Sequence, residues 1–193
     1  MTYKHKGPSK CVARHPSKRE AEIEPTEIDL AMMAAYIDGE GCISTVVAST
    51  TKWKNPSLSI ELSVHNTDPR LVDWCQKRFG GRIYRTIHEN KPEWMDSYGW
   101  KVSCKQASEV LQACLPYFVI KREQAELAIA LESTKARWGR SGAPEEIHRK
   151  WWEIRNQLSL LKGKNARMVI KSPDHVSATH FERRESNGGG KPN

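Results

Sequence analysis

The sequence lacks any apolar run long enough to span a membrane, and its basic N-terminus is not followed by the apolar stretch of a secretory signal peptide. A membrane-spanning helix needs about 20 consecutive apolar residues, so we expect neither a membrane partner nor secretion. The cysteines are odd in number and contain no Cys-x-x-Cys pair: Cys11, Cys42, Cys75, Cys104 and Cys114. This spacing argues against a disulfide framework or a zinc site and is typical of reduced cysteines in an intracellular protein.

Acidic residues are also under-represented relative to basic ones. There are 23 Asp and Glu against 31 Lys and Arg, which gives a formal net charge of +8. Such a charge favours an anionic partner, usually nucleic acid, although a basic protein with a solvated surface is the alternative. The 193 residues are enough for one domain with a core, plus tails.

The stretch from Thr26 to Gly41 predicts a helix with two distinct faces. Thr26 is the expected N-cap, and Asp29 follows at capping-box spacing. One apolar stripe comprises Leu30, Met33 and Ile37. A second stripe contains only small residues that allow another helix to approach closely: Ala31, Ala35 and Gly39.

The end of this helix carries acids where the helix dipole disfavours them. Asp38 and Glu40 lie in or just past the last turn, where cations are favourable and carboxylates are not. Gly39 and Gly41 flank Glu40 and permit a sharp exit from the helix. The arrangement calls for a positive counter-charge, for which a divalent cation is a natural candidate.

Met33 to Gly41 resembles the LAGLIDADG motif of homing endonucleases in its "IDGEG" form. Three positions depart from the motif: Met33, Ala35 and Tyr36. The resemblance implies that the helix packs against its twin and that the last acid, Glu40, holds the catalytic metal. Ala35 adds a methyl group where two such helices nearly touch.

The remaining chain predicts an α+β fold with αββαββα order. Strands are expected at 42–53, 57–65, 82–88 and 99–104, and the helices after the first at 67–79, 105–115, 121–138 and 144–162. This is the order of the LAGLIDADG core, with a four-stranded antiparallel DNA-binding saddle plus C-terminal helices. Residues 115–125, LPYFVIKREQA, resemble the family's "LP-(apolar)-K-x-x-QA" segment.

Three regions are expected along the chain: a disordered basic arm at 1–24, the endonuclease domain at 25–162 and a flexible basic tail at 163–193. The C-terminal helix of the domain, at about 144–162, contains Trp151 and Trp152. Packing of these tryptophans is favoured over stacking on bases, because they lie in a helical apolar stripe.

The family resemblance implies a set of catalytic residues around Glu40. Lys121, Asn66 and Arg70 are expected to position water and offset charge, and the main-chain oxygen of Gly39 to assist Glu40 in binding metal. Lys121 has an ordinary helix-start role as its alternative, and Arg70 an ion pair with Asp68 or Asp73. Asp38 is expected to cap or pair within the dimer interface, together with Ala31, Ala35 and Gly39.

No second "IDGEG" segment occurs, so two chains are needed to bring two copies of Glu40 together. The expected state is a homodimer with two active sites, each cutting one strand. Hard oxygen ligands favour Mg²⁺. Mn²⁺ is expected to substitute, and Ca²⁺ to support binding without cleavage.

DNA reading is expected from the outward-facing strand positions. In 57–65, Leu58, Ile60, Leu62 and Val64 alternate with small polar residues suited to base edges in a major groove, although a plain amphipathic strand is the alternative. The parity of the third strand is ambiguous. The candidate positions are Ser44, Val46, Ala48, Thr50, Lys52, Ser57, Ser59, Glu61, Ser63, His65, Arg82, Tyr84, Arg85, Lys101 and Ser103.

The sequence therefore predicts a Mg²⁺-dependent, site-specific endonuclease that breaks double-stranded DNA at a long pseudo-palindromic site, with no small-molecule substrate. It would spread the intron, intein or free-standing gene that encodes it. The alternative is a catalytically inactive LAGLIDADG nucleic-acid-binding protein, either an RNA maturase or a DNA-binding regulator. The expected location is intracellular, in a bacterial or phage-infected cytoplasm, or else in an organelle.

Overall fold

The computed structural model describes residues 11–12, 20–48, 57–88, 94–135 and 143–163. The chain divides into two compact units, residues 1–47 with 58–135 and residues 48–57 with 136–193. The elements are β1 (Cys11–Val12), α1 (Glu27–Glu40), β2 (Gly41–Ala48), β3 (Ser57–Asn66), α2 (Pro69–Phe79), β4 (Arg82–Thr86), β5 (Ser97–Ser103), α3 (Cys104–Cys114), a 3₁₀ turn η1 (Leu115–Tyr117), α4 (Arg122–Ser133) and α5 (Glu145–Leu161).

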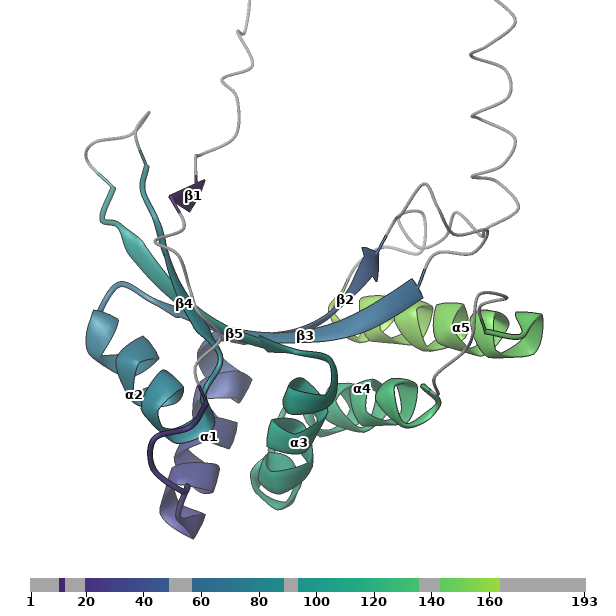
Figure 1. The fold of residues 1–193 in the computed structure, drawn as a ribbon, viewed down its shortest axis with the longest axis horizontal. Coiled ribbons are helices and arrows are strands. Elements are labelled where there is room, and N and C mark those ends of the chain that lie inside the picture. Colours follow the sequence, from purple (N-terminus) through teal and green to yellow (C-terminus); the bar gives the residue numbers. More distant parts are fainter. Residues whose placement is uncertain (1–10, 13–19, 49–56, 89–93, 136–142, 164–193) are drawn as a thin grey trace, which may run out of the picture. The chain divides into compact units, whose positions relative to one another are not determined.

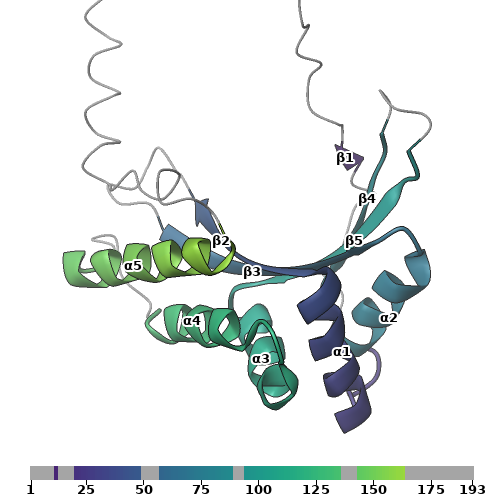
Figure 2. The same cartoon turned by 180° about the vertical axis from the view of Figure 1, so that it is seen from behind.

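The first unit is built on one sheet with the strand order β1-β4-β5-β3-β2. Strands β4, β5 and β3 pair antiparallel. Helices α1 to α4 lie on one side of this sheet in both views (Figures 1 and 2). The α+β class and the αββαββα order predicted from the sequence are confirmed. We call the sheet face that points away from these helices the open face.

Helix α1 begins where its capping residues predict. The backbone N–H of Thr26 donates to Asp29 Oδ2 at 2.8 Å, and the N–H of Asp29 donates back to Thr26 Oγ1 at 3.3 Å. This reciprocal pair satisfies two backbone donors that a helix start leaves free. Met33 and Ile37 are fully buried, so the predicted apolar stripe is the core-facing side of α1.

The core lies between the sheet and these helices and is centred on Trp100. Val64 and Ile83 flank Trp100 across the sheet, and its ring is fully buried. Its indole Nε1 donates to the carbonyl of Gly80 at 2.6 Å, which satisfies the polar edge of a buried aromatic ring. Gly80 and Gly81 both have positive φ, +66° and +89°, and turn the chain from α2 into β4.

Two short segments of the expected arm at 1–24 have backbone partners in the described part of the chain. Cys11 and Val12 pair with Thr86 and Arg85, which adds β1 to the outer edge of β4. The N–H groups of Glu22 and Ile23 donate to the carbonyl of Lys77 at the end of α2. Free backbone groups at a strand edge and a helix end accept such pairing from any sequence, so composition did not signal it.

Helix α2, expected at 67–79, begins at Pro69. Asp68 is its N-cap, and the Asp68 side chain accepts from the N–H of Arg70. The second unit contains α5, whose bounds match the predicted C-terminal helix. Trp151 is buried, which agrees with a packing role. Among the described residues no helix is both long and apolar enough to cross a membrane.

A test of this framework is the turn between α2 and β4. Alanine at Gly81 would keep a φ of +89° and place its Cβ 2.6 Å from Val102 Cγ1 and 2.7 Å from the Lys101 carbonyl oxygen. Gly163 has a φ of +68°, but no atom of the described residues lies within 4 Å of an added Cβ. Gly163→Ala should therefore cost only the backbone term of about 1–2 kcal/mol. Gly81→Ala should lose about 1–3 kcal/mol more through overpacking.

Urea unfolding of the two variants and the wild type, followed by tryptophan fluorescence, measures this difference. Equal losses in the two variants would contradict the close packing at Gly81.

Candidate active site and nucleic-acid interface

Glu40 is the last residue of α1, and the chain turns directly from it into β2 at Gly41. Gly41 donates its N–H to the carbonyl of Ile37. A Cβ at Gly41 would lie 2.6 Å from the Cα of Ile37, so glycine is required for this exit from the helix. The Glu40 side chain is exposed, and no hydrogen bond or ion pair joins its carboxylate to another described residue.

Asp38 is used within the same chain. Its carboxylate accepts from the backbone N–H groups of Val119, Ile120 and Lys121 at 2.8, 3.1 and 2.8 Å. Burial opposes ionisation of this group, but the three amide donors and the nearby Lys121 charge outweigh it, and the pKa of Asp38 lies below its ordinary value. Within one chain Asp38 thus caps the turn at residues 119–121, and its expected role in a dimer interface stays a prediction.

The Lys121 side chain also joins the turn at residues 119–121 to the end of α1. Its Nζ donates to the carbonyl oxygens of Ile37, Asp38 and Gly41 at 2.6, 2.9 and 2.8 Å. An ammonium has three N–H donors, so all three are engaged. Lys121 therefore provides the positive charge that the C-terminal end of α1 requires, a role for which a divalent cation is the candidate predicted from the sequence. Direct action of Lys121 on a phosphate stays a prediction.

Asn66 and Arg70 lie at the end of β3 and the start of α2. Asn66 Oδ1 accepts from the N–H of Asp68 at 2.9 Å. Arg70 Nε donates to both oxygens of Asp68 at 3.0 Å, and these hydrogen bonds hold the pKa of Asp68 at about 2. Of the two partners considered for Arg70, the structure selects Asp68. The guanidinium is nonetheless highly exposed and accessible to an anion.

The chain topology brings Asn66 and Glu40 to the same end of the sheet. Ser44 Oγ donates to the Glu61 carbonyl, and Ser59 Oγ donates to the Val46 carbonyl. These two contacts run in opposite chain directions, which makes β2 and β3 antiparallel neighbours. The start of β2, directly after Glu40, therefore lies beside the end of β3, which is Asn66.

A metal ion at this helix end would have Glu40 as its carboxylate ligand. The exposed Glu40 carboxylate is the kind of hard oxygen donor that Mg²⁺ and Ca²⁺ prefer, and Asp38 is committed elsewhere. Gly39, the other predicted ligand, lies on the exposed side of the last turn. Within the described segments no group of three or more His, Cys, Asp or Glu residues could hold a metal. The described part of one chain would thus supply only part of a coordination shell.

The exposed face of α1 is apolar, with large side chains in its first half and small residues near its C-terminal end. Ile28, Met32, Ala35 and Gly39 are exposed and follow one another at helical intervals of four, three and four residues. Ala31, predicted to lie in this stripe, is half-buried at its border. Beyond the end of α1, the turn that Asp38 holds exposes two more apolar side chains, Val119 at 88% and Ile120 at 72%.

The open face consists of side chains in cross-strand rows. Glu61 lies opposite Ser103, and Lys101 lies between Ser63 and Arg82. Lys101 Nζ is 3.1 Å from Glu61 Oε2, and the same ammonium lies over the Tyr84 ring, 5.5 Å from its centroid. The rows place positive and negative groups side by side at fixed positions on the sheet.

Tyr84 crosses the sheet to reach His65. Gly99 lies between them in the register, and a Cβ at Gly99 would clash with the Tyr84 ring, so the ring lies directly over this glycine. The Tyr84 hydroxyl is hydrogen-bonded to His65 Nε2. Burial lowers the pKa of His65, with Lys101 adding to the effect and Glu61 opposing it.

The register decides the ambiguous parity of β4. Arg82 and Tyr84 share the open face, whereas Arg85 lies opposite Tyr98 on the other face and pairs with Asp96. Of these three candidates for DNA reading, Arg85 therefore does not share the open face. Ser63 is on the open face but is buried to 6% exposure. Ser44, Val46 and Ser59 fit the outward set, Ser57 and Ser103 are exposed, and Ala48 ends β2. Thr50 and Lys52 lie outside the described residues.

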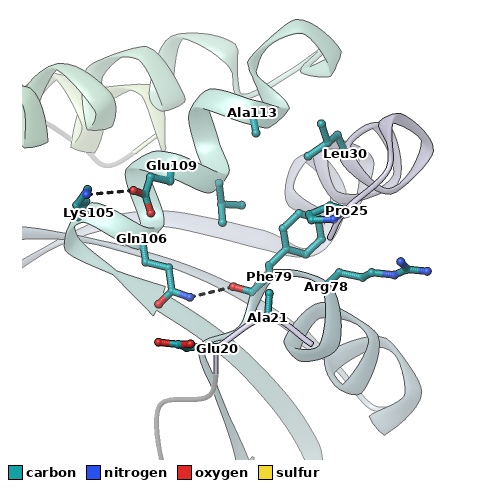
Figure 3. Close-up of a pocket in the computed structure, with 11 residues that line it drawn as sticks. Glu20, Ala21, Pro25, Leu30, Arg78, Phe79, Lys105, Gln106, Glu109 and Ala113 are labelled. Atoms are coloured by element: carbon teal, nitrogen blue, oxygen red, sulfur yellow. Dashed lines mark hydrogen bonds and ion pairs between the residues drawn. The ribbon is translucent and has the colours of Figure 1, made fainter. Parts of the chain in front are cut away.

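A separate hollow of about 470 Å³ opens among the helices rather than on the open face (Figure 3). Leu30, Phe79 and Val110 form its apolar part, and Lys105 and Glu109 form an ion pair at its rim. None of the residues predicted for catalysis or DNA binding lines it.

The link between Asp38 and residues 119–121 predicts a pH-dependent contribution to stability. Asp38→Asn should cost about 1–3 kcal/mol at pH 7, the range for a lost charged hydrogen-bond partner. Because the folded-state pKa lies below the ordinary value of 3.8, this contribution is complete above that pH and disappears as pH falls through the lower, folded-state pKa.

Urea unfolding at pH 7 and at several values below 4 measures the wild-type advantage over Asp38→Asn. Asp73→Asn, an exposed aspartate of α2, is the control and should unfold like wild type at pH 7. A difference between wild type and Asp38→Asn that does not shrink in acid would contradict the ionised link.

No family model and no curated protein matches this sequence. Solved structures do match. The homing endonuclease I-CvuI, in complex with its target in the presence of 2 mM Ca, aligns with 16% identity and a TM-score of 0.59, over 81% of this chain and 94% of its own. An archaeal intron-encoded homing endonuclease, I-Vdi141I, complexed with DNA, aligns with 12% identity and a TM-score of 0.61, over 81% of this chain and 96% of its own.

The LAGLIDADG homing endonuclease I-GzeII, in complex with a DNA target, aligns with 15% identity and a TM-score of 0.54. That alignment covers 85% of this chain but 52% of I-GzeII, so this chain spans about half of it. A second I-CvuI structure, in the presence of 2 mM Mg, contains uncleaved DNA. At these identities the likeness concerns the fold. The chain therefore has the fold of the LAGLIDADG homing endonucleases.

Proposed function

We propose that this protein is a site-specific DNA endonuclease that makes double-strand breaks as a homodimer, with Mg²⁺ as cofactor. The observation that carries the proposal is Glu40: an exposed carboxylate with no partner among the described residues, at the end of the helix that exposes an apolar face. Such a break would spread the genetic element that encodes the protein.

The apolar face of α1 supports pairing of two chains. Ile28 and Met32 would be covered by a second copy, and the small Ala35 and Gly39 would allow the two helices to approach closely near their C-terminal ends. Gly39 has space for this, because a Cβ there would meet nothing within 4 Å. The partial match to the longer I-GzeII is compatible with this reading, because that chain has room for a second unit of similar size.

Pairing along this face would bring two copies of Glu40 to one place. A Mg²⁺ ion bound there would supply Lewis-acid chemistry at a scissile phosphate. Glu40 holds the cation, Lys121 fixes the helix end that carries Glu40, and exposed Arg70 is available to the phosphate. We expect Mn²⁺ to replace Mg²⁺, and Ca²⁺ to allow binding without cleavage. The reported Ca and Mg conditions of the I-CvuI structures support divalent-ion use.

Target recognition falls to the open face. A sheet with an uncovered polar face can enter a major groove, and two such faces related by a two-fold axis read a long pseudo-palindromic site. The excess of Lys and Arg supplies phosphate contacts, so binding should weaken steeply with salt. The DNA complexes of I-CvuI and I-Vdi141I support DNA as the partner.

A binding protein without catalysis is the second candidate, either an RNA maturase or a DNA-binding regulator. One observation favours it: all three donors of Lys121 are engaged by helix carbonyls, so action at a phosphate would require Lys121 to give up one of these hydrogen bonds. Cleavage in Mg²⁺ separates the two functions, since only the endonuclease cuts.

The role of Glu40 is tested by Glu40→Gln, which keeps the shape of the side chain but removes its charge. Cleavage in Mg²⁺ should fall more than about 100-fold, since even residues that merely support metal ligands contribute 10–100-fold. Specific binding should remain within a few-fold of wild type. The substrate is duplex DNA selected by the protein from a randomised pool, and single-turnover cleavage and gel-shift assays give the two readouts.

Glu153→Gln, an exposed glutamate of α5, is the control and should cleave like wild type. Undiminished cleavage by Glu40→Gln would refute the assignment of Glu40.

The homodimer is tested by Met32→Lys, which places a charge in the centre of the exposed face of α1. Sedimentation should give wild type a mass of twice the 22.0 kDa chain and the variant the mass of a single chain, because an unpaired charge is costly to bury. Met95→Lys alters another exposed methionine, away from α1, and should remain dimeric. A monomeric wild type, or a dimeric Met32→Lys, would contradict the proposed interface.

A further inference from the structure

The ion pair of Lys101 and Glu61 is a fixed donor and acceptor unit on the open face. Lys101 comes from β5 and Glu61 from β3, and their charged atoms are 3.1 Å apart. In the register Ser103 lies opposite Glu61, and Lys101 lies between Ser63 and Arg82. The ammonium is also held over the Tyr84 ring. Both charged groups keep part of their surface exposed, 40% for Lys101 and 27% for Glu61.

We propose that Lys101 and Glu61 together read one G·C base pair in each half of the DNA site, Lys101 on guanine and Glu61 on cytosine. This inference rests on the proposed function and names the base pair recognised by this pair of residues. A lysine donates to guanine O6 and N7, and a glutamate accepts from cytosine N4. Because Lys101 and Glu61 are already held side by side by their ion pair, they lose less side-chain entropy on binding DNA than unpaired side chains would.

The spacing of the two groups matches the edge of a base pair. Guanine O6 and cytosine N4 are joined by a Watson–Crick hydrogen bond and therefore lie about 3 Å apart. The 3.1 Å separation of the lysine nitrogen and the glutamate oxygen is the same. A donor beside an acceptor on the protein thus faces an acceptor beside a donor on the DNA.

The groups next to these atoms distinguish G·C from A·T. In A·T the same spacing would set Lys101 on thymine O4 and Glu61 on adenine N6. The ammonium would then lie beside the thymine methyl group, and the carboxylate beside adenine N7, which is an acceptor and repels it. In G·C the ammonium instead lies beside guanine N7, a second acceptor, and the carboxylate meets no acceptor on cytosine.

The structure contains a matched control pair away from the open face. Lys105 and Glu109 on α3 form an ion pair of the same two residue types, 3.5 Å apart, at the rim of the hollow among the helices (Figure 3). Neither belongs to the proposed catalytic or DNA-binding set. Substitutions in this pair remove the same charges without altering the open face.

The experiment is selection of bound duplexes from a randomised pool by wild type, Lys101→Met, Glu61→Gln, Lys105→Met and Glu109→Gln. The wild-type consensus should contain one G·C pair per half-site that is lost in both open-face variants and kept in both control variants. Its preference over A·T should fall about 5- to 150-fold, which corresponds to about 1–3 kcal/mol for a base-specific contact. A uniform loss of affinity at all positions would overturn the proposal and leave phosphate binding as the role of Lys101.

Base analogues at that pair test direct contact. 7-Deazaguanine removes the N7 acceptor and should weaken wild type but not Lys101→Met. N4-Methylcytosine replaces the groove-facing hydrogen on N4 and should weaken wild type but not Glu61→Gln. Insensitivity of wild type to N4-methylcytosine would overturn the contact of Glu61 with cytosine. A pool that yields no consensus would refute site-specific DNA binding itself, whereas a clear consensus unchanged in both open-face variants would refute only this inference.

Discussion

The reciprocal link between the end of α1 and the turn at 119–121 fixes the position on which the rest depends. Asp38 accepts three backbone N–H groups from that turn, and Lys121 returns three hydrogen bonds to the carbonyls at the helix end. A carboxylate at a helix C-terminus is unfavourable alone, and so is a set of unpaired carbonyls. In this link the N–H groups of the turn satisfy the Asp38 carboxylate, and Lys121 satisfies the carbonyls. The link therefore fixes the orientation of the helix end that carries Glu40.

Because of this link, the two acidic residues of the motif, Asp38 and Glu40, have different roles. Asp38 is bound to backbone amides, and its lowered pKa keeps it ionised in that role. Glu40, two residues later, is exposed and has no partner among the described residues. Because the first acid and Lys121 balance the helix end, the second is available to a cation and to a second chain. The apolar stripe through Ile28 and Met32 leads along α1 toward the same end.

On the open face, small residues leave room for the larger side chains next to them. Gly99 allows Tyr84 to lie across β5 and reach His65, and Ser63 lies opposite Lys101. Polar side chains are thereby held in place before any partner binds. Such prior ordering reduces the entropy lost on association, and it places donors and acceptors at definite spacings across three strands.

The sequence alone determined the features that depend on short-range pattern. The capping box at Thr26 and Asp29 and the alternation of 57–65 each act over a few residues, so periodicity and capping chemistry were sufficient to predict them. They gave the αββαββα order, and the motif residues gave the expected family resemblance. The boundaries shifted by a few residues: the helix expected from residue 67 begins at Pro69, because Asp68 serves as its N-cap.

Only the tertiary structure decided which partners the polar groups take. Lys121 and Asp38 are more than 80 residues apart in the chain, so no local pattern showed that they form hydrogen bonds with each other. From the sequence alone, a metal ion was therefore the predicted source of positive charge at the end of α1. The parity of β4 was likewise open until pairing with β5 put Tyr84 on one face and Arg85 on the other. A one-residue change of register exchanges the faces of a strand, and strand pairing is a long-range contact that a linear pattern leaves undetermined.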